Sequence, residues 1–386
     1  MTSARPRSVS TVALLADIPG TGHLGDAQAW RFGMRGDDLT QEWGDFVDFS
    51  RGQMAAGRKI VALYPKWQSE AAWRAIQFAR GTLRTDHIAA VGVDLAPLTI
   101  SLLADQLAYL SPYLPAGMVA ALAEELPKHM VGGAWLRRVS NLETLPTSVR
   151  QHMGSYAPGV SFLAFCAPVP RVGRLRKGDV AANLPARPTD PVQMLWAAPA
   201  EVDTSAFESL VSPSLRPVAV RALSEQPLGT TYWGSTKYVE FVAFSAHPQA
   251  LTYVVNSIRP TSCAWCSEQV TATYCPFCGA VNSTPVGRPP SYSRARDLPP
   301  SPATLSAATA AKAESHPGSS PSPPPPHEGP SNENSAPEAP TPPPRRGPLG
   351  GGASPPNSLP MAPNGHPAQQ PLNPSSRPAP PRNGKV

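Results

Sequence analysis

Residues 59–93 read KIVALYPKWQSEAAWRAIQFARGTLRTDHIAAVGV, and this stretch decides which fold class the sequence predicts. Lys59–Tyr64 and His87–Val93 are short apolar runs, which are typical of buried strands. Ser69–Ala79 places apolar side chains on one face at helical spacing, and Gly81 ends that pattern. A strand, a helix and a second strand in this order indicate a βαβ unit, and therefore a mostly parallel sheet covered by helices.

The same alternation extends outward from this unit. Thr11–Ile18 is another apolar run, and helices are predicted from Asp37 or Asp38 to about Gly57, over 97–110 and over 116–127. After about residue 159 the strands follow one another with only short helices between them, and they are predicted over 160–167, 192–198, 217–223 and 237–245. The expected fold class is α/β, with a mixed sheet, a βαβ-like N-terminal half and an α+β second half.

The last quarter of the chain differs in composition. More than half of the 50 prolines lie after residue 285, where Tyr292 is the one aromatic residue. Such a segment cannot bury enough apolar surface to offset the entropy of ordering it. We therefore expect a disordered Pro-rich tail over 285–386, after an α/β domain or half-domain at 8–158, an α+β domain or second half at 159–259 and a small module at 260–284.

That small module holds the strongest motif in the sequence. Four of the five cysteines stand as two C-x2-C pairs separated by eight residues: Cys263, Cys266, Cys275 and Cys278. A two-residue gap lets both thiolates of a pair point at one ion, and the spacer is long enough for a hairpin that brings the pairs together. Two disulfides or free thiols are the alternative, and iron is an alternative to zinc.

Residues 260–282 resemble the short four-cysteine zinc ribbons of bacterial proteins. The segment Tyr274-Cys275-Pro276-Phe277-Cys278-Gly279 carries the resemblance, whereas Ser267 stands where a glycine often follows the second cysteine. The resemblance implies a structural Zn²⁺ held by all four cysteines, because four thiolates leave no open position for a substrate. It covers this module only and implies no particular ligand for the rest of the chain.

Three weaker signals bear on possible chemistry. Gly20–Gly25 is a G-x-G-x-x-G sequence after a predicted strand and would suit a phosphate, although an ordinary surface turn is favoured. His23 with Asp17, or His87 with Asp86, could form an acid/base pair. No catalytic residue is assigned, and enzyme activity is uncertain with a preference against it. The lone Cys166 lies in an apolar run without a nearby cation, so we expect a buried structural thiol.

The charge of the chain limits the partners that it can bind, and its apolar runs and cysteines indicate its cellular compartment. The net charge is +6, of which about +4 falls in the tail by position and about +2 in the body, so a large nucleic-acid-binding face on the body is not expected. No run of about 18 apolar residues predicts a membrane-spanning helix, and no signal peptide is expected. The cysteine usage is typical of the cytoplasm. Arg outnumbers Lys, which together with abundant Ala, Gly and Pro suggests a bacterial, GC-rich genome.

These observations favour a cytoplasmic interaction or assembly protein with a structural zinc ribbon and a recruiting tail, and therefore a protein partner. One alternative is a nucleic-acid-associated protein that binds through the ribbon and the arginines around it: Arg259, Arg288, Arg294 and Arg296. The other is a nucleotide-using enzyme with a phosphate-binding turn at Gly20–Gly25. The oligomeric state and the cellular process are not readable from the sequence.

Overall fold

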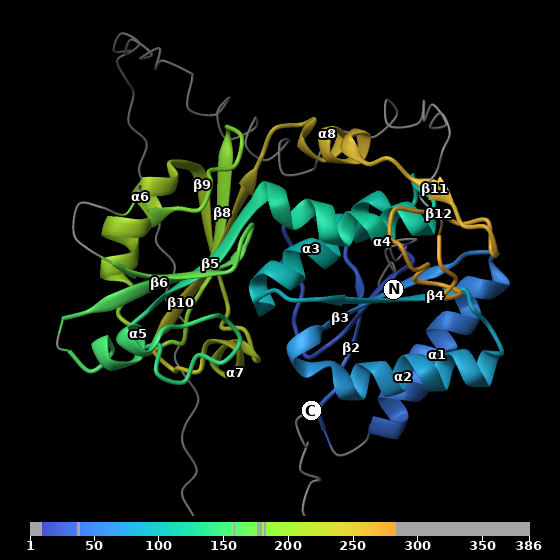
Figure 1. Cartoon of the computed structure of the whole chain (residues 1–386), viewed down its shortest axis with the longest axis horizontal. Helices are drawn as coiled ribbons and strands as arrows, with labels where there is room; N and C mark the ends of the chain where they lie inside the picture. Colours follow the sequence, from blue (N-terminus) through green and yellow to red (C-terminus); the bar gives the residue numbers. More distant parts are fainter. Residues whose placement is uncertain (1–9, 37–38, 158, 176–179, 181–182, 283–386) are drawn as a thin grey trace, which may run out of the picture. The chain divides into compact units, whose positions relative to one another are not determined.

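The computed structural model describes residues 10–36, 39–157, 159–175, 180 and 183–282. The described residues fall within one compact unit, and they form two main sheets and a small two-stranded one (Figure 1). The α/β class predicted from the sequence is confirmed. The tail predicted over 285–386 lies outside the described residues.

The first sheet is parallel and has four strands in the order β2-β1-β3-β4. Its strands are β1 (Val12–Leu15), β2 (Trp30–Phe32), β3 (Ile60–Pro65) and β4 (Ile88–Val93). Helices α1 (Leu39–Ala55) and α2 (Ser69–Leu83) pack together over one face, and a short 3-10 turn, η1 (Lys66–Gln68), precedes α2. The βαβ unit predicted over 59–93 is thus β3–α2–β4.

Helix α3 (Pro97–Leu110) lies between the two main sheets (Figure 1). All its residues are buried, which explains why apolar side chains surround it instead of forming one stripe. Pro97 starts the helix at a position where its missing N–H costs nothing. Helix α4 (Ala116–Glu125) follows and packs on β3 and β4, and the 3-10 turn η2 (Leu126–His129) leads into the second sheet.

The second sheet has six strands in the order β7-β6-β5-β10-β8-β9, antiparallel except for the β8–β9 pair. Its strands are β5 (Met130–Leu136), β6 (Ser161–Ala167), β7 (Arg171–Leu175), β8 (Val192–Ala197), β9 (Pro217–Leu223) and β10 (Tyr238–Ser245). One face packs against the core around α3, and the other forms a separate core with Phe207, Val211 and Leu215. Because β5 belongs to this sheet, the sheets divide near residue 130, ahead of the boundary at 158 that the change in the order of strands and helices suggested.

Short helical segments complete this half of the molecule. They are α5 (Val149–Gly154), the π-helical turn η4 (Phe207–Val211), α6 (Ser212–Leu215), α7 (Gly229–Trp233) and α8 (Ala250–Ser257). The cysteine module then contributes β11 (Thr261–Ser262) and β12 (Gln269–Val270), which pair antiparallel. None of the helices in the described part of the chain is long and apolar enough to cross a membrane.

Candidate functional site

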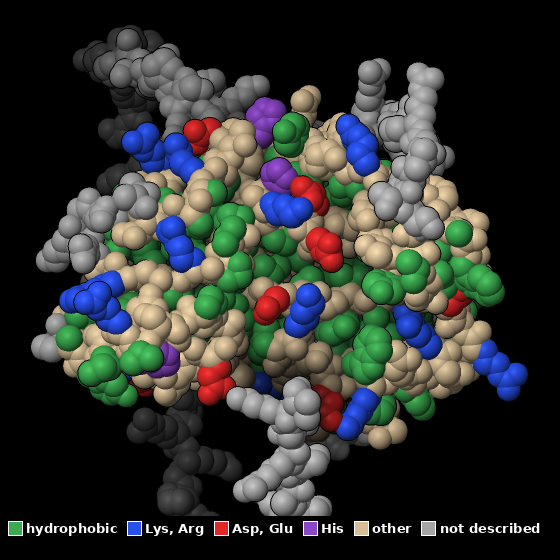
Figure 2. Space-filling view, viewed as in Figure 1, with side chains coloured by type: hydrophobic (Ala, Val, Ile, Leu, Met, Phe, Trp, Pro, Cys, Tyr) green, Lys and Arg blue, Asp and Glu red, His purple; other side chains and the backbone are tan. Residues whose placement is uncertain are grey.

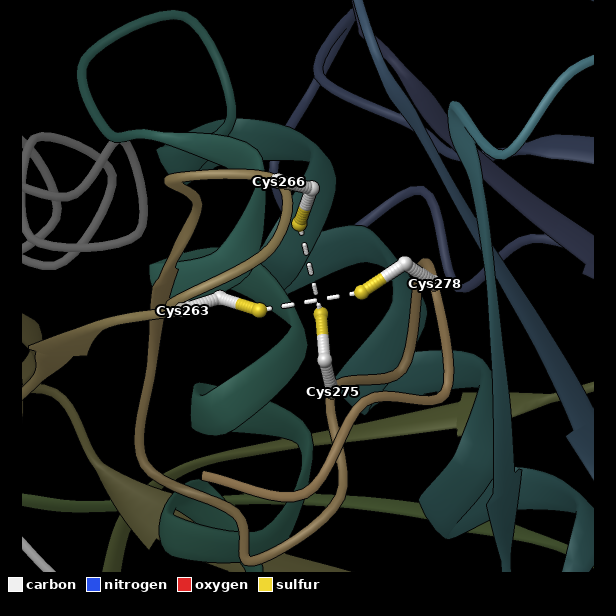
Figure 3. A group of neighbouring side chains, drawn as sticks. All are labelled: Cys263, Cys266, Cys275 and Cys278. Atoms are coloured by element: carbon white, nitrogen blue, oxygen red, sulfur yellow. Dashed lines mark hydrogen bonds between the residues drawn. The ribbon is translucent and has the colours of Figure 1, made fainter. Parts of the chain in front are cut away.

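The four cysteines come together from two similar turns (Figure 3). In each turn the residue after the second cysteine donates its amide to the carbonyl of the first cysteine, Ser267 to Cys263 at 3.0 Å and Gly279 to Cys275 at 2.9 Å. Both donors have positive φ, +58° at Ser267 and +75° at Gly279. Ser267 therefore takes the left-handed conformation that glycine adopts at lower cost.

The four sulfur atoms lie within 4.8 Å of one another. The Sγ atoms of Cys263 and Cys278 are 3.6 Å apart, as are those of Cys266 and Cys275. A disulfide would require about 2.05 Å, so these contacts are not disulfides. Sulfurs around one tetrahedral Zn²⁺ lie about 3.8 Å apart for Zn–S bonds of about 2.3 Å. The spacing of the cluster therefore fits a four-thiolate zinc site.

Backbone amides point at the sulfurs as well. The amides of Cys266 and Trp265 donate to the Cys263 sulfur and lower the pKa of that thiol to about 7, with the Cys266 amide acting most strongly. Burial raises the pKa of Cys266 to about 12 in the same cluster of thiols. A cation at the centre would stabilise all four thiolates together, because amide donors alone stabilise only part of the negative charge.

The cysteine module is attached to the parallel sheet through Glu268. Its carboxylate accepts a hydrogen bond from the Gly117 amide at 3.0 Å and pairs with Lys59 Nζ at 2.8 Å. The Lys59 ammonium also lies 5.4 Å from the centre of the Phe277 ring. Cys263, Cys275 and Phe277 share a small buried cluster with Ala89 of β4. The module thus packs on the first sheet and forms part of its core.

The carbonyl of Pro276 extends this attachment to the sheet edge. It accepts hydrogen bonds from the Ala90 amide of β4 at 3.4 Å and from Arg80 Nη2 at 3.0 Å. Arg80 also donates to the Ile88 carbonyl, so one guanidinium joins α2, β4 and the cysteine turn. Strand β4 is an edge strand of its sheet, and the turn occupies part of its exposed edge.

The glycine-rich turn at Gly20–Gly25 does not form the phosphate site that was the less favoured alternative for it. The short strand β2 follows it where a helix would be needed, so no helix N-terminus points at the turn. The fully buried carboxylate of Asp105 already accepts from the Thr21 amide at 2.9 Å and from Thr21 Oγ1 at 2.7 Å. The Asp105 carboxylate therefore binds the donors that a phosphate would need, and the turn has a structural role.

Asp105 on α3 is the centre of a polar network that the sequence did not indicate. It also pairs with Arg31 Nη2 at 2.8 Å and accepts from the Ala29 amide at 3.3 Å. His23 lies beside this network, and burial, followed by the charge of Arg221, lowers its pKa to about 4 against the opposing effect of Asp105. A neutral His23 is therefore expected near pH 7. The one sign in the sequence is that Asp105 is the single charged residue of an otherwise mostly apolar helix.

The structure does not bring Asp17 and His23 together, and it places Asp86 and His87 side by side at the surface. Asp17 accepts the Met34 amide at 3.1 Å, with no bond to His23. His87 Nε2 lies 3.8 Å from Asp86 Oδ1, but both side chains are half exposed and lie in no described pocket. Cys166 is buried, as expected, and burial raises the pKa of its thiol to about 12, which disfavours the nucleophilic thiolate form.

A pocket of about 490 Å³ lies where η2 and the start of β5 meet the end of β10 and α8. Its wall contains the buried apolar side chains of Leu126, Met130, Val131, Phe244 and Val254. Four basic side chains line it too, and no Asp or Glu does: Lys128, His129, Arg187 and His247. A concave apolar wall with a few polar groups is the usual form of a small-ligand site.

Gln106 supplies a buried polar group in the same pocket. Its side chain is 6% exposed, and its Oε1 has no hydrogen-bond partner among the described residues. An amide group left without a partner in an apolar surrounding is costly, unless a ligand or water satisfies it. This residue was also missed by sequence reasoning, because a glutamine within an apolar helix has no distinguishing motif.

Three solved structures show what the chain is similar to. A DegV family protein from Corynebacterium glutamicum is 15% identical, with 61% of this chain and 96% of that chain covered at a TM-score of 0.42. A DegV family protein from Thermus thermophilus, described as binding fatty acid, is 12% identical over 61% and 98% of the two chains at a TM-score of 0.44. The fatty acid kinase B3 protein from Streptococcus pneumoniae, loaded with linoleic acid, is 10% identical over 60% and 98% at a TM-score of 0.36. No family model matches the sequence, and no curated protein does.

These comparisons correct the function expected from the sequence. The Thermus thermophilus protein is described as binding fatty acid and the Streptococcus pneumoniae protein as loaded with linoleic acid. The sequence had favoured an interaction or assembly protein, with a nucleic-acid-associated protein or a nucleotide-using enzyme as alternatives. The hypothesis of a protein partner and that of a nucleic-acid partner are corrected with them.

The geometry gives physical reasons for the correction. The Arg259 guanidinium donates to the carbonyls of Asn256 and Ile258, so it is held against its own backbone. Arg288, Arg294 and Arg296 lie outside the described residues. On the face drawn in Figure 2, Lys and Arg side chains are scattered and do not form one continuous patch.

Proposed function

We propose that this chain binds an amphiphile with a long apolar part, a fatty acid in the first instance, in the pocket between η2, β10 and α8. One observation supports it above the others: a buried apolar wall and four basic side chains line the same cavity, which contains no acidic side chain. The acyl chain would lie against the wall and the carboxylate would lie near the cations.

Three of the basic side chains already have carboxylate partners beside the pocket, and one of them is His129, whose Nε2 lies 3.8 Å from Glu125 Oε1. Lys128 Nζ lies 2.6 Å from Glu125, and Arg187 Nη2 lies 2.7 Å from Asp190. These pairs are exposed at least in part, and pairs of this kind contribute about 0–1 kcal/mol. A ligand carboxylate can therefore replace or join them at little cost. The side-chain oxygen of Gln106 remains as a further hydrogen-bonding group for a head group.

The experiment compares two tryptophan substitutions on α8. Ala250 lines the pocket and Asn256 is an exposed residue of the same helix outside it, so Ala250→Trp fills the cavity and Asn256→Trp is the matched control. We expect palmitate binding to the delipidated full-length chain, measured by displacement of a fluorescent fatty acid, to weaken at least about tenfold in Ala250→Trp only. Equal binding by both variants, or no saturable binding by the wild-type chain, contradicts the proposal.

The head group has a separate test. Palmitate and palmityl alcohol share the apolar chain, so the ratio of their affinities isolates the contribution of the carboxylate. A pocket with basic side chains should prefer palmitate, and the preference should shrink as salt rises. A preference for the alcohol would contradict the assigned position of the head group.

We also propose that Cys263, Cys266, Cys275 and Cys278 hold one structural Zn²⁺ and form a small zinc ribbon. The sulfur spacing, the two matching turns and the amide donors support this ligand set. The ion would supply folding energy to a segment with a very small core of its own. Purified protein should contain one zinc per chain, and Cys275→Ser should lose it. Full zinc content in that variant excludes the four-cysteine site.

The same features support a reducing compartment for the protein, and the cytoplasm is our proposal. Cys166 is buried as a free thiol, and the other four cysteines are placed to bind a metal and not to form disulfides. The mass of the intact protein, isolated under conditions that trap thiols, tests this. A pair of oxidised cysteines in freshly isolated protein would contradict it.

A further inference from the structure

A second pocket lies at the opposite end of the two central strands of the six-stranded sheet. Strands β5 and β10 are antiparallel neighbours, and the proposed fatty-acid pocket contains Met130 at the start of β5 and Ser245 at the end of β10. The second pocket has a volume of about 400 Å³ and is lined by Arg137 and Lys237, which stand directly beyond the other ends of these strands. The two pockets are therefore separated by the length of strand β5, which extends about 3.3 Å per residue.

The second pocket has three positive charges and no negative one in its lining. Arg137, Arg138 and Lys237 contribute the charges, and none of them forms an ion pair with a carboxylate of the described residues. Asp203, an exposed neighbour that Arg137 influences electrostatically, lies outside the lining. Three like charges in one concavity repel each other, so an anion there is stabilised by all three.

The remaining lining residues supply hydrogen-bond donors. Ser140, Ser235, Thr236 and Thr230 bring hydroxyl groups, and Asn141 brings an amide. Hydroxyls and cations together match the oxygens of a phosphate group, each of which accepts several hydrogen bonds. The same set would not suit an apolar ligand, since no large aliphatic or aromatic side chain lines the cavity.

The backbone around this pocket is held in place before any ligand arrives. Gly234 has φ of +59°, and a Cβ at that position would lie 2.0 Å from the Asn141 carbonyl oxygen, so the two loops are in close contact. The Arg137 amide donates to the Lys237 carbonyl at 3.3 Å, which ties the strand ends together. The Arg137 guanidinium lies 5.4 Å from the centre of the Trp135 ring. These contacts lower the entropy lost when a ligand binds.

We propose that this second pocket binds the phosphate group of a phosphorylated small molecule. The volume exceeds what one inorganic phosphate needs, so the ligand carries an organic part that fills the rest of the cavity. The phosphate lies against Arg137, Arg138 and Lys237, and the hydroxyl side chains orient it. This site is separate from the proposed fatty-acid pocket, and loss of one leaves the other unchanged.

The test uses the full-length chain and three probes at constant ionic strength: inorganic phosphate, glycerol phosphate, and vesicles of phosphatidylcholine with or without phosphatidic acid. Calorimetry measures binding of the two soluble probes, and co-sedimentation measures vesicle binding. The double variant Arg138→Gln/Lys237→Gln should weaken soluble phosphate binding at least about thirtyfold. The control Arg150→Gln, an exposed arginine on α5 that lines none of the described pockets, should bind like the wild type.

The outcomes distinguish a soluble organic phosphate, a phosphorylated lipid head group and no phosphate site at all. Binding of glycerol phosphate that is tighter than that of inorganic phosphate, and that the double variant loses, supports a soluble organic phosphate. Binding of phosphatidic acid vesicles alone, lost in the same variant, supports the same pocket with a lipid head group as the source. No binding of any probe, or binding that the double variant and Arg150→Gln retain equally, overturns the proposal. Urea unfolding of the double variant, measured in parallel, confirms that the protein is folded.

Discussion

Replacement of Glu268 by alanine should detach the cysteine module from the parallel sheet. Glu268 is 9% exposed, and it satisfies the Gly117 amide and the Lys59 ammonium at once. A hydrogen bond to a charged group contributes about 1.5–3 kcal/mol, and the loss of a partly buried ion pair adds about 1 kcal/mol. We therefore expect Glu268→Ala to lower the free energy of unfolding by about 3 kcal/mol, and Glu268→Gln, which still accepts from the Gly117 amide, by about 1 kcal/mol.

The measurement is urea unfolding of the full-length chain, combined with hydrogen exchange at β4 and at residues 260–282. Local detachment predicts faster exchange at Ala90, whose amide bonds the Pro276 carbonyl, before the rest of the sheet changes. Glu70→Ala is the control, because Glu70 forms an exposed helical pair with Arg74 and should change stability by less than about 0.5 kcal/mol. If Glu268→Ala matches that control, the attachment through Glu268 does not stabilise the protein.

Three further predictions address separate contacts. Gly117→Ala should lower the free energy of unfolding in urea by about 1–3 kcal/mol, because the added Cβ would lie 2.0 Å from the Gln269 carbonyl oxygen. An unchanged unfolding midpoint would mean that the module can move away from α4 freely. Ser267→Gly should slow zinc loss to a chelator, because glycine takes the positive φ of this position without strain, whereas faster loss would contradict this. Burial raises the pKa of Glu240 from 4.5 to about 8 against the bond from the Leu98 amide, so its contribution to stability is full below pH 4.5 and lost as pH rises to about 8. Glu240→Gln should flatten that part of the pH–stability curve, and an unchanged curve would show that Glu240 ionises normally.

The sequence predicted three of the four strands of the first sheet, whereas the three-residue strand β2 was missed because it is too short to show a pattern. The strand at 59–64 and the helices at 69–79 and 97–110 agree with β3, α2 and α3 within a few residues at their ends. Each has a single period of apolar residues and a proline or glycine near one end. In these three elements the pattern of apolar residues agrees with the structure. A helix with one apolar face buries that face, and a wholly apolar strand or helix is buried on all sides.

Strand β5 was missed although it is central in the second sheet. Its sequence contains Gly132 and Gly133, which lower the strand propensity of the segment. The structure shows why they are needed: a Cβ on Gly132 would lie 2.3 Å from Thr99 Oγ1, and one on Gly133 would lie 2.3 Å from the Ala164 carbonyl oxygen. The glycines allow close packing with α3 and β6, which is a tertiary requirement that no local pattern reveals.

The candidate pockets could not be predicted for a related reason. Both are formed by strand ends and turns far apart in the sequence, such as η2 with α8, or residues 137–141 with 230–237. Basic residues at such positions look like ordinary solvated charges until the fold brings them together. The cysteine motif was visible only because all four residues lie within one short segment and have a spacing that few other functions require.

The position of the cysteine module gives it a role in the stability of the first sheet. Edge strands with free backbone groups tend to pair with other chains, and β4 is such an edge. The module brings residues 263–278 back to β4 over a long sequence separation, fills its edge at Ala90 and buries Ala89 beneath Phe277. Because the module has only a small core, we expect its order to depend on the proposed metal site and on Glu268. Loss of the cluster should therefore expose β4 first, while the six-stranded sheet, which shares no hydrogen bond with the module among the described residues, stays folded.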